Sequence, residues 1–154
     1  MVVSELHFLL IVNLIIREID SFMDRQITKQ SIEGLISKLG LPEGDVYCQD
    51  WEYEIASPEM AVKLLMDYIE QKDLTEDEKF TLMHVILESI NDFISNRSEK
   101  FPLLEEFRMV ALRDYYLHKE TFEYWASWEQ ADIDEAFEIT PIIRGFIAEA
   151  ERNE

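Results

Sequence analysis

Apolar residues recur at helical spacing along most of this sequence. Residues 32–39 follow the i, i+3, i+4, i+7 pattern of one buried helix face, and residues 80–93 carry a longer apolar face of the same kind. The sequence has only four glycines and four prolines, which leaves little turn chemistry for a sheet of many strands. The pattern predicts an all-α fold, a compact helical array or irregular bundle of six to seven helices.

Capping residues, glycine and proline mark the expected helix boundaries. Thr28 and Gly40 flank one helix, and Thr75-Glu76-Asp77-Glu78 is a capping box that begins another, expected over residues 75–95. Cap-plus-proline pairs stand at Ser57-Pro58 and Thr140-Pro141. Further helices are expected over residues 4–24, 57–72, 102–118 and from residue 140, with shorter helical pieces at 121–130 and 132–139. No linker divides the chain, so residues 1–154 are expected to form a single helical domain.

Residues 7–16 (HFLLIVNLII) are strongly apolar. They lack the basic flank of a signal peptide, carry Glu5 on that side, and are followed by Arg17 and Glu18 with no small-residue cleavage site. A stretch of about ten residues is also too short to span a bilayer. We expect a buried core helix here, with no targeting or membrane-spanning segment.

The balance of charge is strongly acidic. The chain has 33 acidic and 14 basic residues, a formal net charge of −19. Nucleic acids and anionic membranes both select basic surfaces, so neither is expected as a direct partner. A basic protein is the partner that this charge favours, because opposite charge accelerates association. The alternative is an acidic cytosolic protein whose charge has no specific use.

No motif for catalysis is present. The sequence lacks a phosphate-binding loop, a dinucleotide-binding turn, a nucleophile elbow and the H-E-x-x-H zinc motif. The pairs His84–Glu88 and Asp114–His118 have i, i+4 spacing, but a tight metal site needs further ligands. We therefore expect no enzyme activity, no cofactor and no metal site. Cys48 is the only cysteine, which is typical of a reducing, cytoplasmic location.

The candidate binding site is an acidic and aromatic segment. The helical period is lost over residues 43–56, which predicts a loop, with or without a short extended piece. Residues 43–79 contain twelve acids and three lysines, a local net charge of −9. Exposed rings supply desolvated anchors and acids orient a basic partner. The predicted partner-binding residues are Asp45, Tyr47, Asp50, Trp51, Glu52, Tyr53, Glu54, Glu76, Asp77 and Glu78.

Two further interpretations concern the aromatic residues. Trp51 and Tyr53 can instead turn inward and fill the gap between two helices. A second aromatic cluster lies at residues 122–128, with acids around it. Trp125 and Trp128 are three residues apart, which places both on one helical face and favours core packing for this cluster.

Two stretches carry a resemblance to a known class of proteins. They are Asp50-Trp51-Glu52-Tyr53 and the run 74–83, which includes LTEDEKF. This pattern resembles small acidic bacterial proteins encoded beside polymorphic toxins, including immunity proteins of contact-dependent growth inhibition systems. The resemblance implies a cytosolic protein that neutralises a basic toxin, often a nuclease, with acids in place of the substrate's phosphates. It transfers no individual binding residue.

The sequence therefore predicts a non-enzymatic acidic protein-binding module, an immunity protein that binds and neutralises a basic toxin in the cytosol. Two alternatives remain open. One is a DNA mimic that inhibits a nucleic-acid-binding protein, and the other is a metal-dependent all-α enzyme that uses acidic side chains. The sequence leaves the oligomeric state open.

Overall fold

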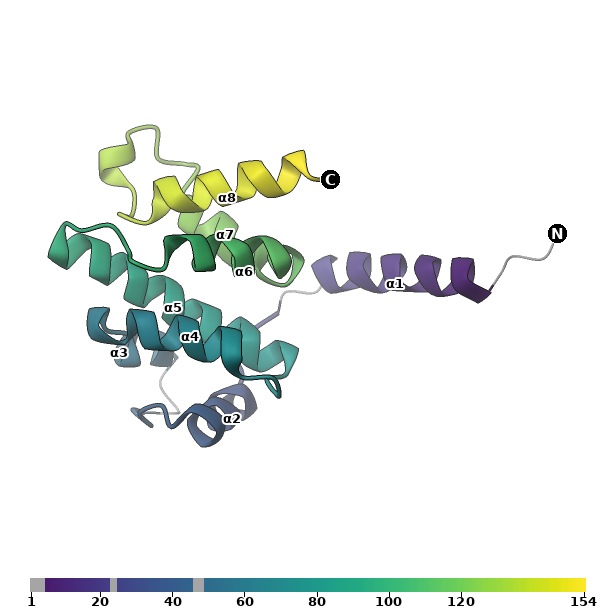
Figure 1. Ribbon diagram of the computed structural model, residues 1–154, viewed down its shortest axis with the longest axis horizontal. Helices are drawn as coiled ribbons and strands as arrows, with labels where there is room; N and C mark the ends of the chain where they lie inside the picture. The colour runs from purple at the N-terminus through teal and green to yellow at the C-terminus, as the bar shows by residue number, and fades with distance from the viewer. Residues whose placement is uncertain (1–4, 23–24, 46–48) are drawn as a thin grey trace.

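The computed structural model describes residues 5–22, 25–45 and 49–154, without the side chains of residues 17–22. These residues form eight α-helices and two short 3₁₀ helices, which confirms the all-α fold class (Figure 1). The α-helices are α1 (Glu5–Phe22), α2 (Lys29–Leu39), α3 (Trp51–Ile55), α4 (Ala61–Glu70), α5 (Glu76–Arg97), α6 (Leu104–Arg113), α7 (Tyr115–Ala126) and α8 (Thr140–Arg152). The 3₁₀ helices are η1 (Pro58–Met60) and η2 (Ile133–Glu135).

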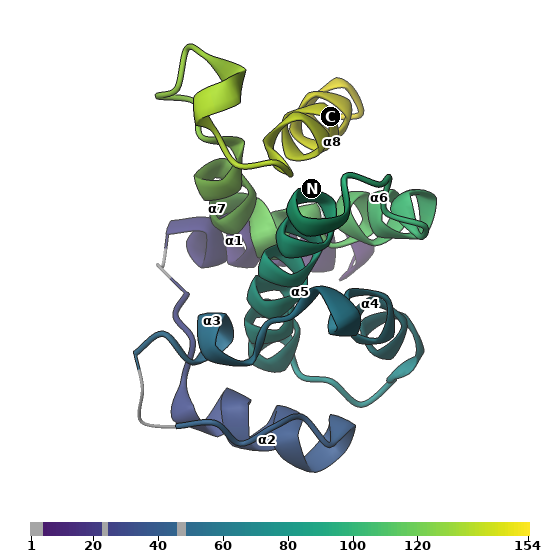
Figure 2. The ribbon, with the colours of Figure 1, turned by 90° about the vertical axis from the view of Figure 1, so that its left-hand side faces the viewer.

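Helix α5 is the central element. Helices α2, α3 and α4 pack against it together with η1, while α7 contacts it from another side (Figures 1 and 2). Helix α8 lies across α6 and α7. Because neighbours cover α5 on several faces, its buried residues are almost continuous from Phe80 to Ile90. The core is one connected cluster that extends from Ile32 to Ala150.

Local signals place several helix ends as expected. The Thr28 hydroxyl accepts a hydrogen bond from the Ser31 N–H, and Gly40 ends α2 in the left-handed conformation at φ 67°. The capping box at Thr75 is confirmed, since the Thr75 hydroxyl accepts from the Glu78 N–H and the Glu78 carboxylate accepts from the Thr75 N–H. The expected cap at Thr140 is wrong. Its hydroxyl donates to the Trp125 carbonyl at 2.7 Å and so joins α8 to α7.

The helix expected over residues 102–118 is in fact two helices. The chain bends at Asp114, which separates α6 from α7. The Asp114 carboxylate accepts hydrogen bonds from the Tyr68 hydroxyl at 2.7 Å and from the Arg113 guanidinium at 2.7 Å. Tyr68 belongs to α4, so a tertiary contact holds the residue at which the expected helix breaks.

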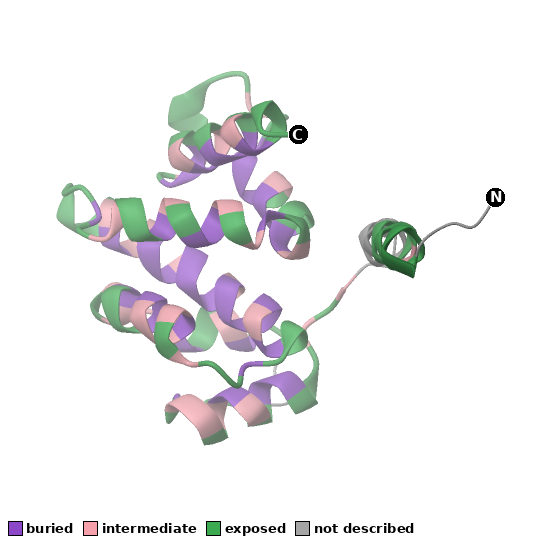
Figure 3. Ribbon diagram, turned by 45° about the vertical axis from the view of Figure 1, so that its right-hand side comes forward, coloured by how far each residue is buried: buried purple, intermediate pink, exposed green. Residues whose placement is uncertain are grey.

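The expectation of a buried core helix at residues 7–16 is wrong. Helix α1 forms there, but it stands away from the other helices and its side chains are largely exposed (Figure 3). Its few contacts with the rest of the chain are made chiefly with α7. The hydrophobic core is therefore built without the most apolar segment of the sequence.

The central position of α5 can be tested with two isoleucines. Ile86 in α5 is fully buried, whereas Ile133 in η2 is 42% exposed. We expect Ile86→Ala to lower the free energy of unfolding by about 2–4 kcal/mol, because it leaves a cavity in the core. Ile133→Ala is the matched control and should cost less than about 1 kcal/mol. Urea denaturation followed by circular dichroism measures both, and equal losses would contradict the central burial of α5.

Candidate functional site

The aromatic residues of the predicted site divide between core and surface. Residues 51–55 form α3 and not the expected loop, and α3 packs on α5. Trp51 is 0% exposed, and its indole N–H donates to the Glu43 carbonyl at 2.9 Å. Tyr53 is 46% exposed. Trp51 therefore fills the core as the alternative interpretation stated, and Tyr53 is the ring of this pair that a partner can reach.

The loop before α3 is organised by one of its own acids. The Glu54 carboxylate accepts hydrogen bonds from the Asp45 N–H at 3.1 and 3.2 Å. It lies over Gly44, which has a φ of 51°, and a Cβ built on Gly44 would meet the carboxylate at 3.2 Å. Glu54 thus stabilises a turn, while Asp45 and Asp50 are exposed. Tyr47 lies outside the described residues.

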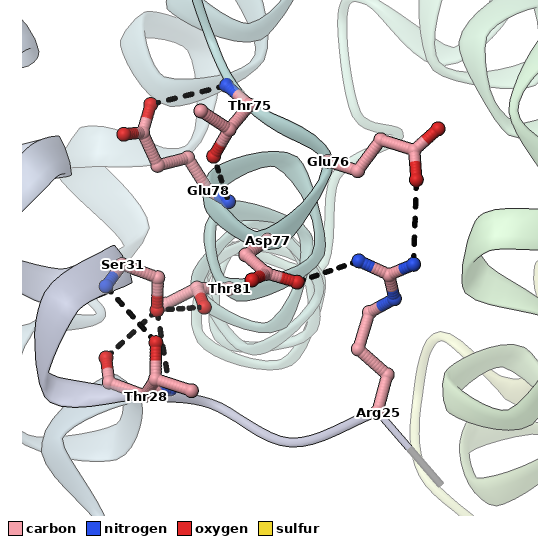
Figure 4. Close-up of polar contacts among 8 residues, drawn as sticks. All are labelled: Arg25, Thr28, Ser31, Thr75, Glu76, Asp77, Glu78 and Thr81. Carbon is pink, nitrogen blue, oxygen red and sulfur yellow. Dashed lines mark hydrogen bonds and ion pairs between the residues drawn. The ribbon is translucent and has the colours of Figure 1, made fainter. Parts of the chain in front are cut away.

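The acids at the start of α5 are already engaged within the chain (Figure 4). Glu78 is buried, and besides capping Thr75 it accepts from the Lys38 ammonium at 2.8 Å. The Arg25 guanidinium donates to Asp77 at 2.6 Å and to Glu76 at 3.3 Å. Buried and paired carboxylates add little to a docking surface, so Glu78 acts chiefly as a structural residue.

The two parts of the predicted site lie apart. At a rise of 1.5 Å per residue, Glu78 is about 15 Å along α5 from Glu88, which is the α5 carboxylate that interacts with Glu52 of α3. The structure thus joins α3 to the middle of α5 rather than to its beginning. Glu76, Asp77 and Glu78 do not share one small surface with Glu52 and Tyr53.

A different set of residues comes together around α3. Glu52 and Tyr53 of α3 lie beside Glu88 of α5, which has Asp92 one turn further along. Tyr124 of α7 meets Tyr53 closely enough for their hydroxyl groups to interact, and Tyr124 is itself exposed. We call Glu52, Tyr53, Glu88, Asp92 and Tyr124 the acid–tyrosine surface. It unites the two aromatic clusters that the sequence shows separately.

The carboxylates of this surface are held under unfavourable electrostatic conditions. Partial burial, Asp92 and Glu52 together raise the pKa of Glu88 to about 7. Burial also raises the pKa of Glu52 and of Asp92 above their ordinary values. The Glu52 Oε2 atom is buried and has no hydrogen-bond partner among the described residues. Burial and the Tyr124 contact likewise raise the pKa of Tyr53. None of the groups that shift the pKa of Glu88 is a cation.

The second aromatic cluster is only partly a core cluster. Trp125 is buried as expected, but Trp128 is exposed, because α7 ends at Ala126 and Ser127 adopts a left-handed conformation at φ 48°. The Trp128 indole N–H donates to Glu123 at 2.6 Å, and the Arg144 guanidinium lies 5.0 Å from its ring centroid. The expectation of core packing is therefore correct for Trp125 and wrong for Trp128.

The histidines considered as metal ligands have other roles. The Tyr68 hydroxyl lies 2.7 Å from His118 Nε2 and also binds Asp114, so the Asp114–His118 pair belongs to a hydrogen-bond network between α4 and α7. Burial lowers the pKa of His118 to about 3 and that of His84 to about 4. In the part of the chain that the structure describes, no three His, Cys, Asp or Glu side chains converge as a metal site would require.

Glu88, Asp92 and Tyr124 are absent from the predicted partner-binding residues. One signal in the sequence points to two of them, since Glu88 and Asp92 are an i, i+4 pair of acids within the stretch 80–93 that carries the apolar face. Like charges at that spacing destabilise a helix, so their presence on α5 calls for an explanation. Tyr124 has no comparable signal, because its approach to Tyr53 depends on the packing of α7 near α3.

Comparisons with known protein families, with curated proteins and with solved structures return no match to this chain. None of the described helices combines the length and the apolar character that crossing a bilayer requires.

The raised pKa of Glu88 predicts a specific pH dependence of stability. Its folded-state pKa of about 7 exceeds the reference value of 4.5, so the folded protein holds this proton more tightly than the unfolded chain. The contribution of protonated Glu88 to the free energy of unfolding is fully present below about pH 4.5 and is lost as the pH rises through 7. Because Glu88 is still partly exposed to solvent, which screens its charge, we expect a loss of only about 1 kcal/mol.

Glu88→Gln should remove this part of the pH dependence, as measured by urea denaturation between about pH 4 and pH 8. Glu106→Gln, an exposed carboxylate of α6, changes the net charge equally and should retain the wild-type slope. If wild type and Glu88→Gln show the same slope, the electrostatic description of the acid–tyrosine surface is incorrect.

Proposed function

We propose that this chain is a non-enzymatic binding module that neutralises a basic toxin domain in the cytosol, as immunity proteins do. The partner docks on the acid–tyrosine surface. The observation that carries the proposal is the convergence of Glu52, Glu88 and Asp92 beside two exposed tyrosines, with raised carboxylate pKa values and no cation among their causes.

A cation from a partner would offset the electrostatic repulsion between the carboxylates of this surface. The three acidic groups are partly removed from water, and Glu52 and Asp92 both repel the charged form of Glu88, which makes ionisation of Glu88 costly. A lysine or arginine inserted among them offsets the repulsion and satisfies the buried Glu52 oxygen. Binding of a basic partner is therefore expected to lower the pKa of Glu88 from about 7 towards the ordinary range.

The tyrosines supply the apolar part of the contact. Tyr53 and Tyr124 present large rings with polar tips, a type of side chain that is enriched at binding hot spots. The formal charge of −19 adds long-range attraction towards a basic domain and raises the association rate. This combination of central rings and surrounding acids fits a basic protein better than a small-molecule substrate.

The test begins with the partner. The full-length chain is immobilised and used to capture its partner from the native host, and the product of the adjacent open reading frame is the first candidate for co-expression. We expect that this product inhibits growth alone and that co-expression of this chain restores growth. Calorimetry should give a dissociation constant that rises with salt, since screening slows association of opposite charges.

Two variant pairs locate the surface. Tyr53→Ala and Glu88→Lys should each raise the dissociation constant at least about tenfold. Tyr116→Ala in α7 and Glu106→Lys in α6 change the same residue types at exposed positions elsewhere and should stay within about threefold of wild type. Equal affinity of all four variants would rule out the acid–tyrosine surface. Failure to relieve toxicity would rule out the toxin-neutralising function.

A further inference from the structure

Helix α1 exposes more apolar surface than any other element that the structure describes. Eight of its large apolar side chains are between 49% and 67% exposed. They are Leu6, Phe8, Leu9, Leu10, Ile11, Leu14, Ile15 and Ile16. Each successive residue of a helix turns by about 100°, so these side chains project in every direction around the axis. A helix that is apolar on all sides requires cover on all sides.

The surroundings of α1 in its own chain do not provide that cover. Figures 1 and 2 both place α1 beside the junction of α6 and α7, and Figure 3 shows it standing off from the rest of the fold. Arg25 anchors the chain just after α1 to the start of α5. Helix α1 therefore projects its apolar residues away from the rest of the fold.

We propose that α1 is a dimerisation helix, and that two copies of this chain associate by packing their α1 helices against each other. The exposed area is sufficient. At roughly 150–200 Å² for a fully exposed residue of this size, the eight residues present on the order of 700–900 Å². A stable interface of standard size buries about 800 Å² on each partner.

Charge also favours a second copy in this place. Residues 6–16 contain no Asp, Glu, Lys or Arg and form the longest stretch of the sequence without one. Two chains of charge −19 repel each other at most surfaces, whereas residues 6–16 of α1 let them meet without like charges in contact. Met109 on α6 and Tyr116 on α7 are also exposed, and α7 is the helix that α1 chiefly contacts.

A lipid surface fits α1 less well. Helices that lie in a membrane interface carry several lysines or arginines on a polar face, whereas α1 has one arginine, Arg17, and three acids. The acidic chain is also repelled by anionic lipids. Two apolar helices can pack together without any basic residue. The composition of α1 therefore supports a second copy of this chain as its partner.

The dimer is tested on the full-length protein by sedimentation equilibrium at about 50 μM chain, in about 50 mM and about 500 mM NaCl. We expect a dimer whose dissociation constant falls at the higher salt, because screening reduces repulsion between the acidic chains. The triple variant Leu10→Gln, Ile11→Gln, Leu14→Gln should raise the dissociation constant at least about 100-fold. Glutamine keeps the helix propensity high, so the helical circular dichroism should persist.

A control separates this effect from a general loss of apolar surface. The double variant Val62→Gln, Ile133→Gln alters exposed apolar residues on α4 and η2 and should dimerise as wild type does. A monomeric wild type at both salt concentrations would overturn the proposal, as would a triple variant that remains dimeric. A wild type that is monomeric in solution and binds neutral phosphatidylcholine vesicles through α1 would also overturn it and assign α1 to lipid.

This proposal does not depend on the proposed function. Salt strengthens the dimer and weakens binding of a basic partner, so the two associations are distinguished by the sign of their salt dependence. The triple variant in α1 should also retain affinity for the partner, because the acid–tyrosine surface lies on α3, α5 and α7.

Discussion

The burial of α5 on several faces is the constraint on which the other helices depend. Residues from Phe80 to Ile90 leave water only if neighbours cover the helix from more than one side. Helices α2, α3, α4 and α7 supply that cover. Polar contacts fix how the neighbours meet α5, since the Ser31 and Thr81 hydroxyls lie 2.7 Å apart in the interface with α2, and Lys38 binds the buried Glu78 carboxylate.

Helix α5 also carries two carboxylates, Glu88 and Asp92, whose charged forms are disfavoured by its burial. Glu88 and Asp92 lie one turn apart on α5, next to Glu52, in a region partly closed to water. Apolar or neutral residues at these positions would stabilise the fold more, since like charges at i, i+4 spacing repel. A binding surface explains this cost, because a cation brought by a partner turns the repulsion into attraction. The acids at the start of α5, by contrast, are balanced within the chain by Arg25 and Lys38.

Sequence patterns predicted the elements whose causes are local. The cap at Thr28, the capping box at Thr75, the glycine that ends α2 and the apolar face of α5 depend on residues a few positions apart, and the structure confirms them. The prediction was wrong where distant residues decide. The expected helix divides at Asp114, which Tyr68 of α4 holds by a hydrogen bond, and Trp51 lies in the core where α3 packs on α5. Trp128 is exposed because α7 ends two residues earlier than the spacing of the tryptophans suggests.

Local sequence accounts for the helical content, the strong acidity and the apolar stretch at residues 7–16, because helix propensity, charge and periodicity depend on neighbouring residues. The packing of helices that are distant in sequence decides which acids are paired, which aromatic rings face water, and that Tyr53, Glu88 and Tyr124 belong to one surface. These outcomes depend on how three separate helices pack together. The residue pattern of a single helix does not specify which side chains of other helices will contact it.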